Sequence, residues 1–125
     1  MARALVLMGS GETSPTMVTP HQQILKNVTG KKFILDTPYG FQENADELTE
    51  KIRSYFEVNV GIKAEDARLR TQVDRAADIA NAIANINSAE WVFTGPGSPT
   101  YALKTWRETG ASEALKNLLR SEEHT

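Results

Sequence analysis

Short apolar runs alternate with longer amphipathic stretches along the chain. The runs at residues 4–8, 32–36 and 91–94 are almost continuously apolar, which is typical of strands covered on both faces of a parallel sheet. A weaker strand is predicted at residues 67–73, where charged side chains interrupt the pattern. Strands that alternate with helices of about 10–15 residues indicate βαβ units. The pattern therefore predicts an α/β fold with three layers and a mostly parallel, flavodoxin-like sheet.

The predicted helices begin at residues that cap helix N-termini. Ser98 is the clearest N-cap, because Pro99 follows it at the first helical position. A further helix is predicted around residues 112–119. The other three starts are predicted at Thr19, Asn44 and Asp74. Gly30 and Gly61 are expected to end the first two helices.

Three unusual loops follow the predicted strands, at residues 9–14, 36–41 and 95–99. Because ligands bind at the carboxyl ends of strands in open α/β sheets, we expect these loops to converge on one site. Backbone N–H groups of Gly95 and Gly97, at the mouth of a helix, fit a carboxylate, a phosphate or a developing oxyanion. The candidate ligand contacts are Ser10, Gly11, Glu12, Asp36, Tyr39 and Ser98, with Phe41 beside Tyr39.

Plain structural roles compete with these assignments. The Gly-Pro-Gly sequence at 95–97 also suits a simple strand-to-helix turn. Glu12 also suits the terminus of the helix that follows it, and Asp36 can cap its own turn before Thr37 and Pro38. The aromatic residues Trp91, Phe93, Tyr101 and Trp106 are expected in the core rather than in a binding platform.

Composition narrows the class of protein. The chain has 125 residues, enough for one modest domain, and a formal charge of -2 with scattered basic residues, so no nucleic-acid partner is expected. It has no apolar run long enough to cross a membrane, and no membrane partner is expected. Cysteine is absent, which excludes disulfides and agrees with a cytoplasmic location.

The last six residues, 120–125, differ from the rest of the chain. They read Arg-Ser-Glu-Glu-His-Thr, which resembles the translation of a widely used sequencing adapter. We therefore expect residues 1–119 to be the N-terminal part of a single α/β domain truncated at its C-terminus, followed by a non-native tail. A small binding domain that ends at Thr125 is the alternative.

The sequence contains no assembled catalytic group. No nucleophile, base and orienting residue can be combined, metal-ligand spacing is absent, and His21 lies in a predicted helix start without a suitable serine partner. Gly9, Gly11 and Ser14, together with Asp36, invite a second interpretation as a nucleotide-binding, Rossmann-like module. Against it, serine stands where that motif has its third glycine, and the helix starts too far from the glycines.

The segments at residues 7–12, 35–40 and 93–98 together carry a family resemblance. They read Leu-Met-Gly-Ser-Gly-Glu, Leu-Asp-Thr-Pro-Tyr-Gly and Phe-Thr-Gly-Pro-Gly-Ser. The chain resembles the N-terminal part of class I glutamine amidotransferase-like proteins, and is most similar to their serine-hydrolase branch, which includes aspartyl dipeptidase and cyanophycinase.

The resemblance implies a hydrolase of an amide or peptide bond, with a small peptide or amide as substrate and no cofactor. It makes Gly95 and Gly97 the candidate oxyanion donors and places the serine nucleophile and the histidine beyond Leu119, so that this chain alone is expected to be inactive. Proline stands at position 96, where a second glycine is usual, and proline has no N–H, which leaves Gly97 as the donor. The Gly-Pro-Gly-Ser order is closer to the amidotransferase form of the loop. A homodimer is left open.

Overall fold

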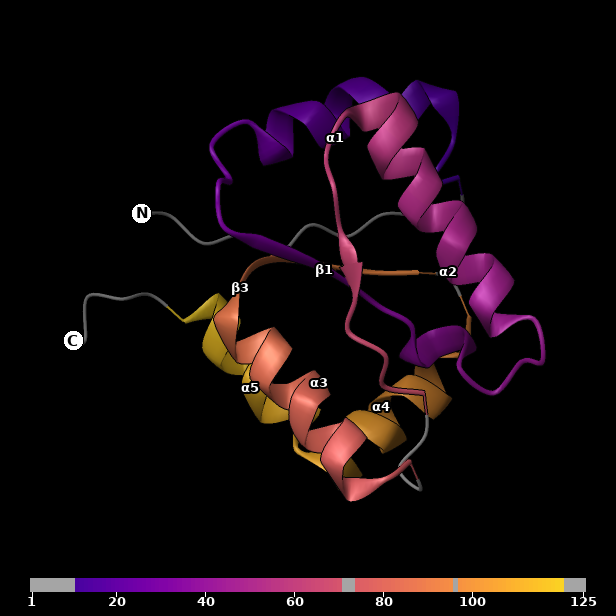
Figure 1. Ribbon diagram of the computed structural model, residues 1–125, viewed down its shortest axis with the longest axis vertical. Helices are drawn as coiled ribbons and strands as arrows, with labels where there is room; N and C mark the ends of the chain where they lie inside the picture. Colours follow the sequence, from indigo (N-terminus) through magenta and orange to yellow (C-terminus); the bar gives the residue numbers. More distant parts are fainter. Residues whose placement is uncertain (1–10, 71–73, 96, 121–125) are drawn as a thin grey trace.

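The computed structural model describes residues 11–70, 74–95 and 97–120 and has an α/β fold built on a small parallel sheet (Figure 1). The strands are β1 (Lys31–Leu35), β2 (Glu65–Asp66) and β3 (Ala89–Thr94). The α-helices are α1 (Val18–Leu25), α2 (Ala45–Ser54), α3 (Ala76–Ser88), α4 (Pro99–Thr109) and α5 (Ala111–Leu119). Short 3₁₀ helices at Pro15–Met17 and Thr37–Tyr39, and a π-helix at Tyr55–Val60, complete the described elements.

β1 is the central strand of the described sheet, with β2 and β3 parallel to it on either side. Its apolar residues point alternately to the two faces, so Ile34 joins one buried cluster while Phe33 and Leu35 join another. Both faces of β1 are therefore covered by apolar side chains, as its continuous apolar pattern predicts.

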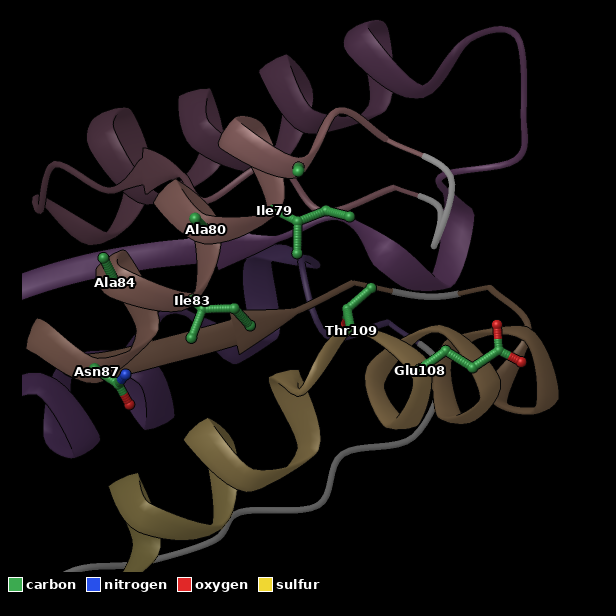
Figure 2. Close-up of a pocket in the computed structure, with 8 residues that line it drawn as sticks. Ile79, Ala80, Ile83, Ala84, Asn87, Glu108 and Thr109 are labelled. Atoms are coloured by element: carbon green, nitrogen blue, oxygen red, sulfur yellow. The ribbon is translucent and has the colours of Figure 1, made fainter.

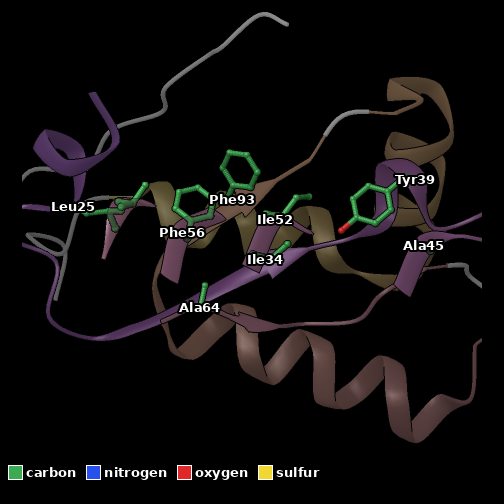
Figure 3. Packing of buried hydrophobic residues seen from close by; sticks show 9 residues of the cluster. Leu25, Ile34, Tyr39, Ala45, Ile52, Phe56, Ala64 and Phe93 are labelled. Carbon is green, nitrogen blue, oxygen red and sulfur yellow. The ribbon is translucent and has the colours of Figure 1, made fainter. Parts of the chain in front are cut away.

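The first cluster packs α1, α2 and the π-helix against β1 and β3 (Figure 3). Phe56 is its centre, fully buried, with ring centroids 4.9 Å from those of His21 and Phe93 and 5.0 Å from that of Trp91. These edge-to-face contacts add to the burial of apolar area. The second cluster joins α3 and α5 to the other side of β1.

The helix ends confirm several predictions made from local sequence. Ser98 is the N-cap of α4, and its hydroxyl accepts a hydrogen bond from the Tyr101 N–H at 3.1 Å. Gly61 ends the π-helix that continues α2, with a φ of 94° that glycine adopts without strain. The aromatic residues predicted for the core are also placed there in part: Phe93 is buried, and Trp91 and Trp106 pack against the two clusters.

The helix ends predicted at Thr19, Gly30 and Asp74 are wrong, and the one predicted at Asn44 is right in position only. Thr19 lies within α1, because the preceding 3₁₀ turn leads directly into a helix that begins at Val18 and ends at Leu25, before Gly30. Asn44 does occupy the N-cap position of α2, but its side chain makes no capping hydrogen bond. Asp74 is not the cap of α3, which is Arg75, and the Asp74 carboxylate accepts a hydrogen bond from the Arg70 N–H.

The strand predicted at residues 67–73 is also wrong over residues 67–70, and its last three residues, 71–73, lie outside the described residues. The observed strand is β2, two residues long and earlier in the chain. The extended ladder stops because the Leu69 N–H donates to the Asp36 carboxylate rather than to a neighbouring strand, and Arg68 turns the backbone with a φ of 51°. The predicted strand at residues 4–8 and the candidate Ser10 lie outside the described residues.

Replacing Ser98 by alanine is expected to destabilise the protein by about 1 kcal/mol, because the Tyr101 N–H loses its side-chain acceptor. Urea denaturation followed by circular dichroism would measure the change in the free energy of unfolding. Ser54→Ala is the matched control, because Ser54 is exposed in the last turn of α2, where alanine favours the helix. Equal losses in the two variants would contradict a capping role for Ser98.

Candidate functional site

The loops that follow β1 and β3 meet at the carboxyl edge of the sheet. The Ser98 N–H donates to the Pro38 carbonyl at 2.8 Å, which joins the two loops directly. Gly97 lies so close that a Cβ atom at this position would overlap the Pro38 carbonyl, and a Cβ atom on Gly95 would lie 2.8 Å from the Tyr39 ring. Two of the three loops predicted to converge are therefore in contact.

The glycine loop itself leads from β3 into the N-terminus of α4. Gly97 is exposed and Gly95 is half-buried. The Ser98 side chain caps the N-terminus of α4. A helix N-terminus carries partial positive charge from its unpaired N–H groups, which favours a carboxylate or a developing negative oxygen nearby. Gly97 is thus exposed to solvent, and its neighbour Ser98 is fixed by the hydrogen bond to Pro38.

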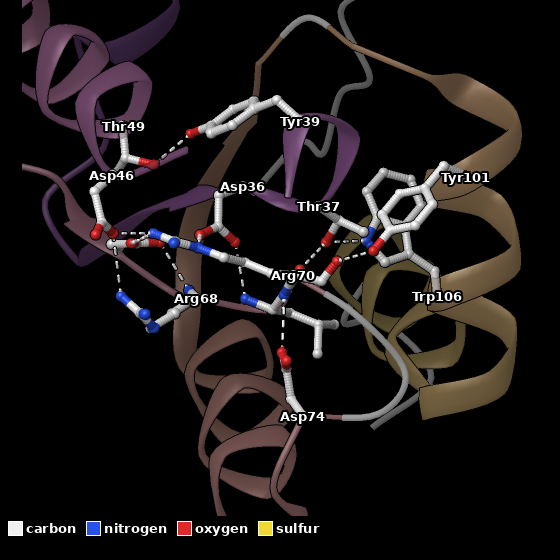
Figure 4. A network of polar contacts seen from close by, with 12 residues as sticks. Asp36, Thr37, Tyr39, Asp46, Thr49, Arg68, Arg70, Asp74, Tyr101 and Trp106 are labelled. Atoms are coloured by element: carbon white, nitrogen blue, oxygen red, sulfur yellow. Dashed lines mark hydrogen bonds and ion pairs between the residues drawn. The ribbon is translucent and has the colours of Figure 1, made fainter. Parts of the chain in front are cut away.

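Asp36 lies at the end of β1 and is fully buried (Figure 4). One carboxylate oxygen accepts the Leu69 N–H at 2.9 Å, and the other accepts Arg70 Nε at 2.7 Å. Arg70 also donates to the exposed Asp46 at 2.5 Å. A buried carboxylate needs such partners, because desolvation without them costs several kcal/mol. In this structure Asp36 anchors the segment after β2 and does not face solvent.

Arg70 is the hub of this network, and sequence reasoning did not single it out. Burial by itself lowers the pKa of the Arg70 guanidinium, but its hydrogen bonds to Asp36 and Asp46 raise the pKa by more. Its carbonyl accepts the Tyr101 hydroxyl at 2.6 Å, so the hub also ties α4 to the segment after β2. The one signal in the sequence was the charged residues that interrupt the predicted strand at 67–73.

Asp66 lies next to this hub, and the side chain is 21% exposed. Burial raises the pKa of Asp66 from 3.8 to about 6, and the neighbouring Asp36 carboxylate adds to the rise. Its carboxylate accepts the Arg68 N–H at 2.8 Å. An acid whose pKa is raised on folding stabilises the fold while it is protonated, and this contribution is lost as the pH rises through the folded-state pKa.

The Asp66→Asn variant is therefore expected to change the pH dependence of stability. Relative to the variant, the native protein should lose about 1–3 kcal/mol of unfolding free energy between about pH 4 and pH 7, because only the native side chain becomes charged. Asparagine keeps an oxygen for the Arg68 N–H, which limits other changes. Chemical denaturation of both proteins across this range measures the difference, and parallel pH profiles would contradict the raised pKa.

Tyr39 and Thr37 have structural partners as well. The buried Tyr39 hydroxyl lies 2.6 Å from the Thr49 hydroxyl, and burial raises the pKa of Tyr39 to about 12. The Thr37 hydroxyl donates to the Leu69 carbonyl and accepts Trp106 Nε1 at 2.8 Å. Asp36 and Tyr39 would have to exchange these partners to contact a ligand. Phe41 is different, because its ring is 55% exposed, against Tyr101.

The described part of the first loop is held by two side chains. His21 is buried, and its Nε2 lies 2.6 Å from the Glu12 carbonyl, while the Tyr55 hydroxyl donates to the Ser14 carbonyl at 2.7 Å. His21 therefore fixes the Glu12 carbonyl from a buried position. Gly11 has a φ of 88° in the turn before Ser14. α1 begins only at Val18, after the 3₁₀ turn, which does not favour the dinucleotide interpretation.

A separate hollow of about 500 Å³ lies on the surface of α3 (Figure 2). It is bordered by the small and aliphatic side chains of α3, with Glu108 and Thr109 from the end of α4 at one side. It shares no residue with the glycine loop. Its wall carries few groups able to take part in a reaction, and it is not a candidate catalytic site.

Within residues 11–70, 74–95 and 97–120, no cluster of three or more histidine, aspartate or glutamate side chains is arranged to hold a metal ion. The helices of the same residues are all too short or too polar to cross a membrane. Comparison of the chain with protein-family models, curated protein sequences and solved structures found no match.

Proposed function

We propose that this chain is the N-terminal part of a class I glutamine amidotransferase-like hydrolase with a three-layer, flavodoxin-like fold. The enzyme would cleave an amide or peptide bond of a small substrate through a serine nucleophile. The observation that carries the proposal is the exposed Gly97 turn between β3 and α4, capped by Ser98 and seated on the loop that follows β1.

In this proposal the turn stabilises the negative charge that forms on the substrate oxygen during the reaction. When a nucleophile attacks an amide carbonyl, the oxygen becomes an oxyanion, and fixed backbone N–H groups lower the energy of that state. Pro96 has no N–H, so Gly97 is the proposed donor, with Gly95 as the second candidate. The N-terminus of α4 adds its partial positive charge at the same place. Asp36 and Arg70 support the loops indirectly, by fixing the end of β1.

The nucleophile and its histidine are proposed to lie outside the 125 residues. The purified chain is accordingly expected to show no turnover of an aspartyl dipeptide above a buffer blank, measured by release of free amino acid. Turnover that persists after repurification would contradict the proposal that the nucleophile and its histidine lie outside this chain.

The decisive experiment is to recover the gene from source DNA and read about 30 codons beyond Leu119, enough for one connection and one strand. The expected result is a strand that ends in a serine or cysteine at a strand-to-helix turn, with a histidine later. The full-length protein should then hydrolyse an aspartyl dipeptide or a related amide, and alanine at that serine should abolish hydrolysis. A gene that stops after Thr125, or that has no nucleophile at the turn, would overturn the proposal.

A further inference from the structure

An aromatic pair joins the loop that follows β1 to the first turn of α4. The ring centroids of Phe41 and Tyr101 lie 5.1 Å apart, and the rings meet edge to face with 61° between their planes. Tyr101 is half-buried and Phe41 is 55% exposed, so the pair presents an apolar surface to solvent. A single exposed apolar side chain is common on protein surfaces, so the meaning of this pair depends on where it lies.

The pair lies beside the glycine turn. The Pro38 carbonyl accepts the Ser98 N–H at 2.8 Å, and the Ser98 hydroxyl accepts the Tyr101 N–H at 3.1 Å. Phe41 is three residues after Pro38, so at about 3.3–3.6 Å per residue their Cα atoms lie at most about 11 Å apart. A substrate held at the turn by its amide carbonyl would therefore bring a neighbouring side chain within reach of the Phe41 ring.

The Arg70 backbone holds both members of the pair in place. The Arg70 carbonyl accepts the Tyr101 hydroxyl at 2.6 Å (Figure 4). Gly40, directly before Phe41, packs so closely on Arg70 that a Cβ atom there would lie 2.7 Å from the Arg70 carbonyl oxygen. The Gly40 N–H also donates to the Thr37 carbonyl at 2.9 Å. A surface that is already in position loses less conformational freedom when a ligand binds.

We infer that Phe41 and Tyr101 contact a substrate side chain next to the bond that is cleaved, and that this side chain is aromatic. The inference rests on the proposed function, because it takes the glycine turn as the place where the substrate carbonyl binds. A flat ring can cover the exposed part of Phe41, and offset or edge-to-face contacts between rings add to the burial of apolar area. Phe41 has no polar group, and the Tyr101 hydroxyl already donates to Arg70, so the pair does not suit an acidic side chain.

Binding of small amides to the purified 125-residue chain tests the inference without any need for hydrolysis. N-acetyl-phenylalaninamide and N-acetyl-alaninamide are titrated separately, and the backbone amide NMR signals of Gly97 and Ser98 report binding at the turn. The dissociation constant of the phenylalanine amide is expected to be about fivefold lower than that of the alanine amide. Equal dissociation constants, or no shift of these two signals with either amide, would overturn the inference. Tighter binding of N-acetyl-argininamide would also overturn it, because the rings would then favour a cation.

Phe41→Ala is expected to remove the preference, so that the ratio of the two dissociation constants falls from about five to about one while the alanine amide binds as before. Val58→Ala is the matched control, because Val58 is another exposed apolar residue, 76% exposed on the π-helix, and the ratio should not change. Equal weakening of both amides in Phe41→Ala would assign Phe41 a structural role and overturn the inference. Far-ultraviolet circular dichroism checks that each variant has the native helix content.

Failure of this inference can be told apart from failure of the proposed function. Hydrolysis by the full-length protein together with equal binding of the two amides would overturn only the aromatic contact. A gene that encodes no nucleophile would overturn the enzymatic function, while a fivefold preference lost in Phe41→Ala would still show an aromatic-binding site at the glycine turn.

Discussion

Replacing Gly97 by alanine is expected to be among the most damaging single changes in this protein. The new Cβ would overlap the Pro38 carbonyl, which is backbone and already accepts the Ser98 N–H. Gly97 also has a φ of 148°, a backbone angle that residues other than glycine rarely adopt. Overpacking costs about 1–3 kcal/mol, and backbone strain adds about 1–2 kcal/mol, so a total loss of about 2–5 kcal/mol is expected.

Gly110→Ala is the matched control for this variant. Gly110 also has a positive φ, of 88°, but a Cβ atom there would meet nothing within 4 Å. Its expected cost is the backbone strain alone, about 1–2 kcal/mol. Thermal and urea unfolding of the two variants compare the values directly. If Gly97→Ala lowers the free energy of unfolding by no more than Gly110→Ala does, the close contact between the glycine turn and Pro38 is contradicted.

The second large effect is expected at Arg70. The Arg70→Met variant should lose about 3–5 kcal/mol of unfolding free energy, because it leaves the fully buried Asp36 carboxylate without its cation. Methionine fills much of the same volume, so the loss reports mainly the missing charge and hydrogen bonds. Lys116→Met removes an exposed ion pair with Glu113 and should change stability by less than about 1 kcal/mol.

A double-mutant cycle measures the interaction free energy between Asp36 and Arg70 apart from their other contacts. Asp36→Asn keeps an oxygen that can accept the Leu69 N–H while it removes the charge. Combined with Arg70→Met, it should cost about 1–3 kcal/mol less than the sum of the two single variants, because each single change leaves one partner of the pair unpaired. Additive losses would show that the two residues act separately, contrary to the contact at 2.7 Å.

Local signals in the sequence predicted much of the fold. The strands at residues 32–36 and 91–94, the N-cap at Ser98 and the helix end at Gly61 all agree with the structure to within a few residues. Each depends on apolar periodicity or on the conformational preference of one or two residues. The strand predicted at 67–73 failed over its described part because the Asp36 side chain, distant in sequence, accepts the Leu69 N–H, and the cap predicted at Asp74 lies one residue before the observed N-cap, Arg75.

In the candidate site, too, some features could be predicted from local sequence and others could not. The sequence identified the glycine turn and the loop after β1, because glycine, proline and an aspartate at a strand end are visible in any single stretch of chain. It could not identify Arg70 as the partner of Asp36, 34 positions away, or Thr49 as the partner of Tyr39. Those partners determine that Asp36 and Tyr39 are buried and engaged rather than exposed to a ligand.

Apolar spacing and backbone preference within a few residues were enough to predict β1, β3, α4 and the glycine turn between β3 and α4. The position of β1 between β2 and β3, and the contact of the Gly97 turn with Pro38, could be learned only from the folded structure. The physical reason is that apolar burial drives segments together without specifying partners. Close backbone contacts and buried charge pairs, such as Asp36 with Arg70, then select one arrangement.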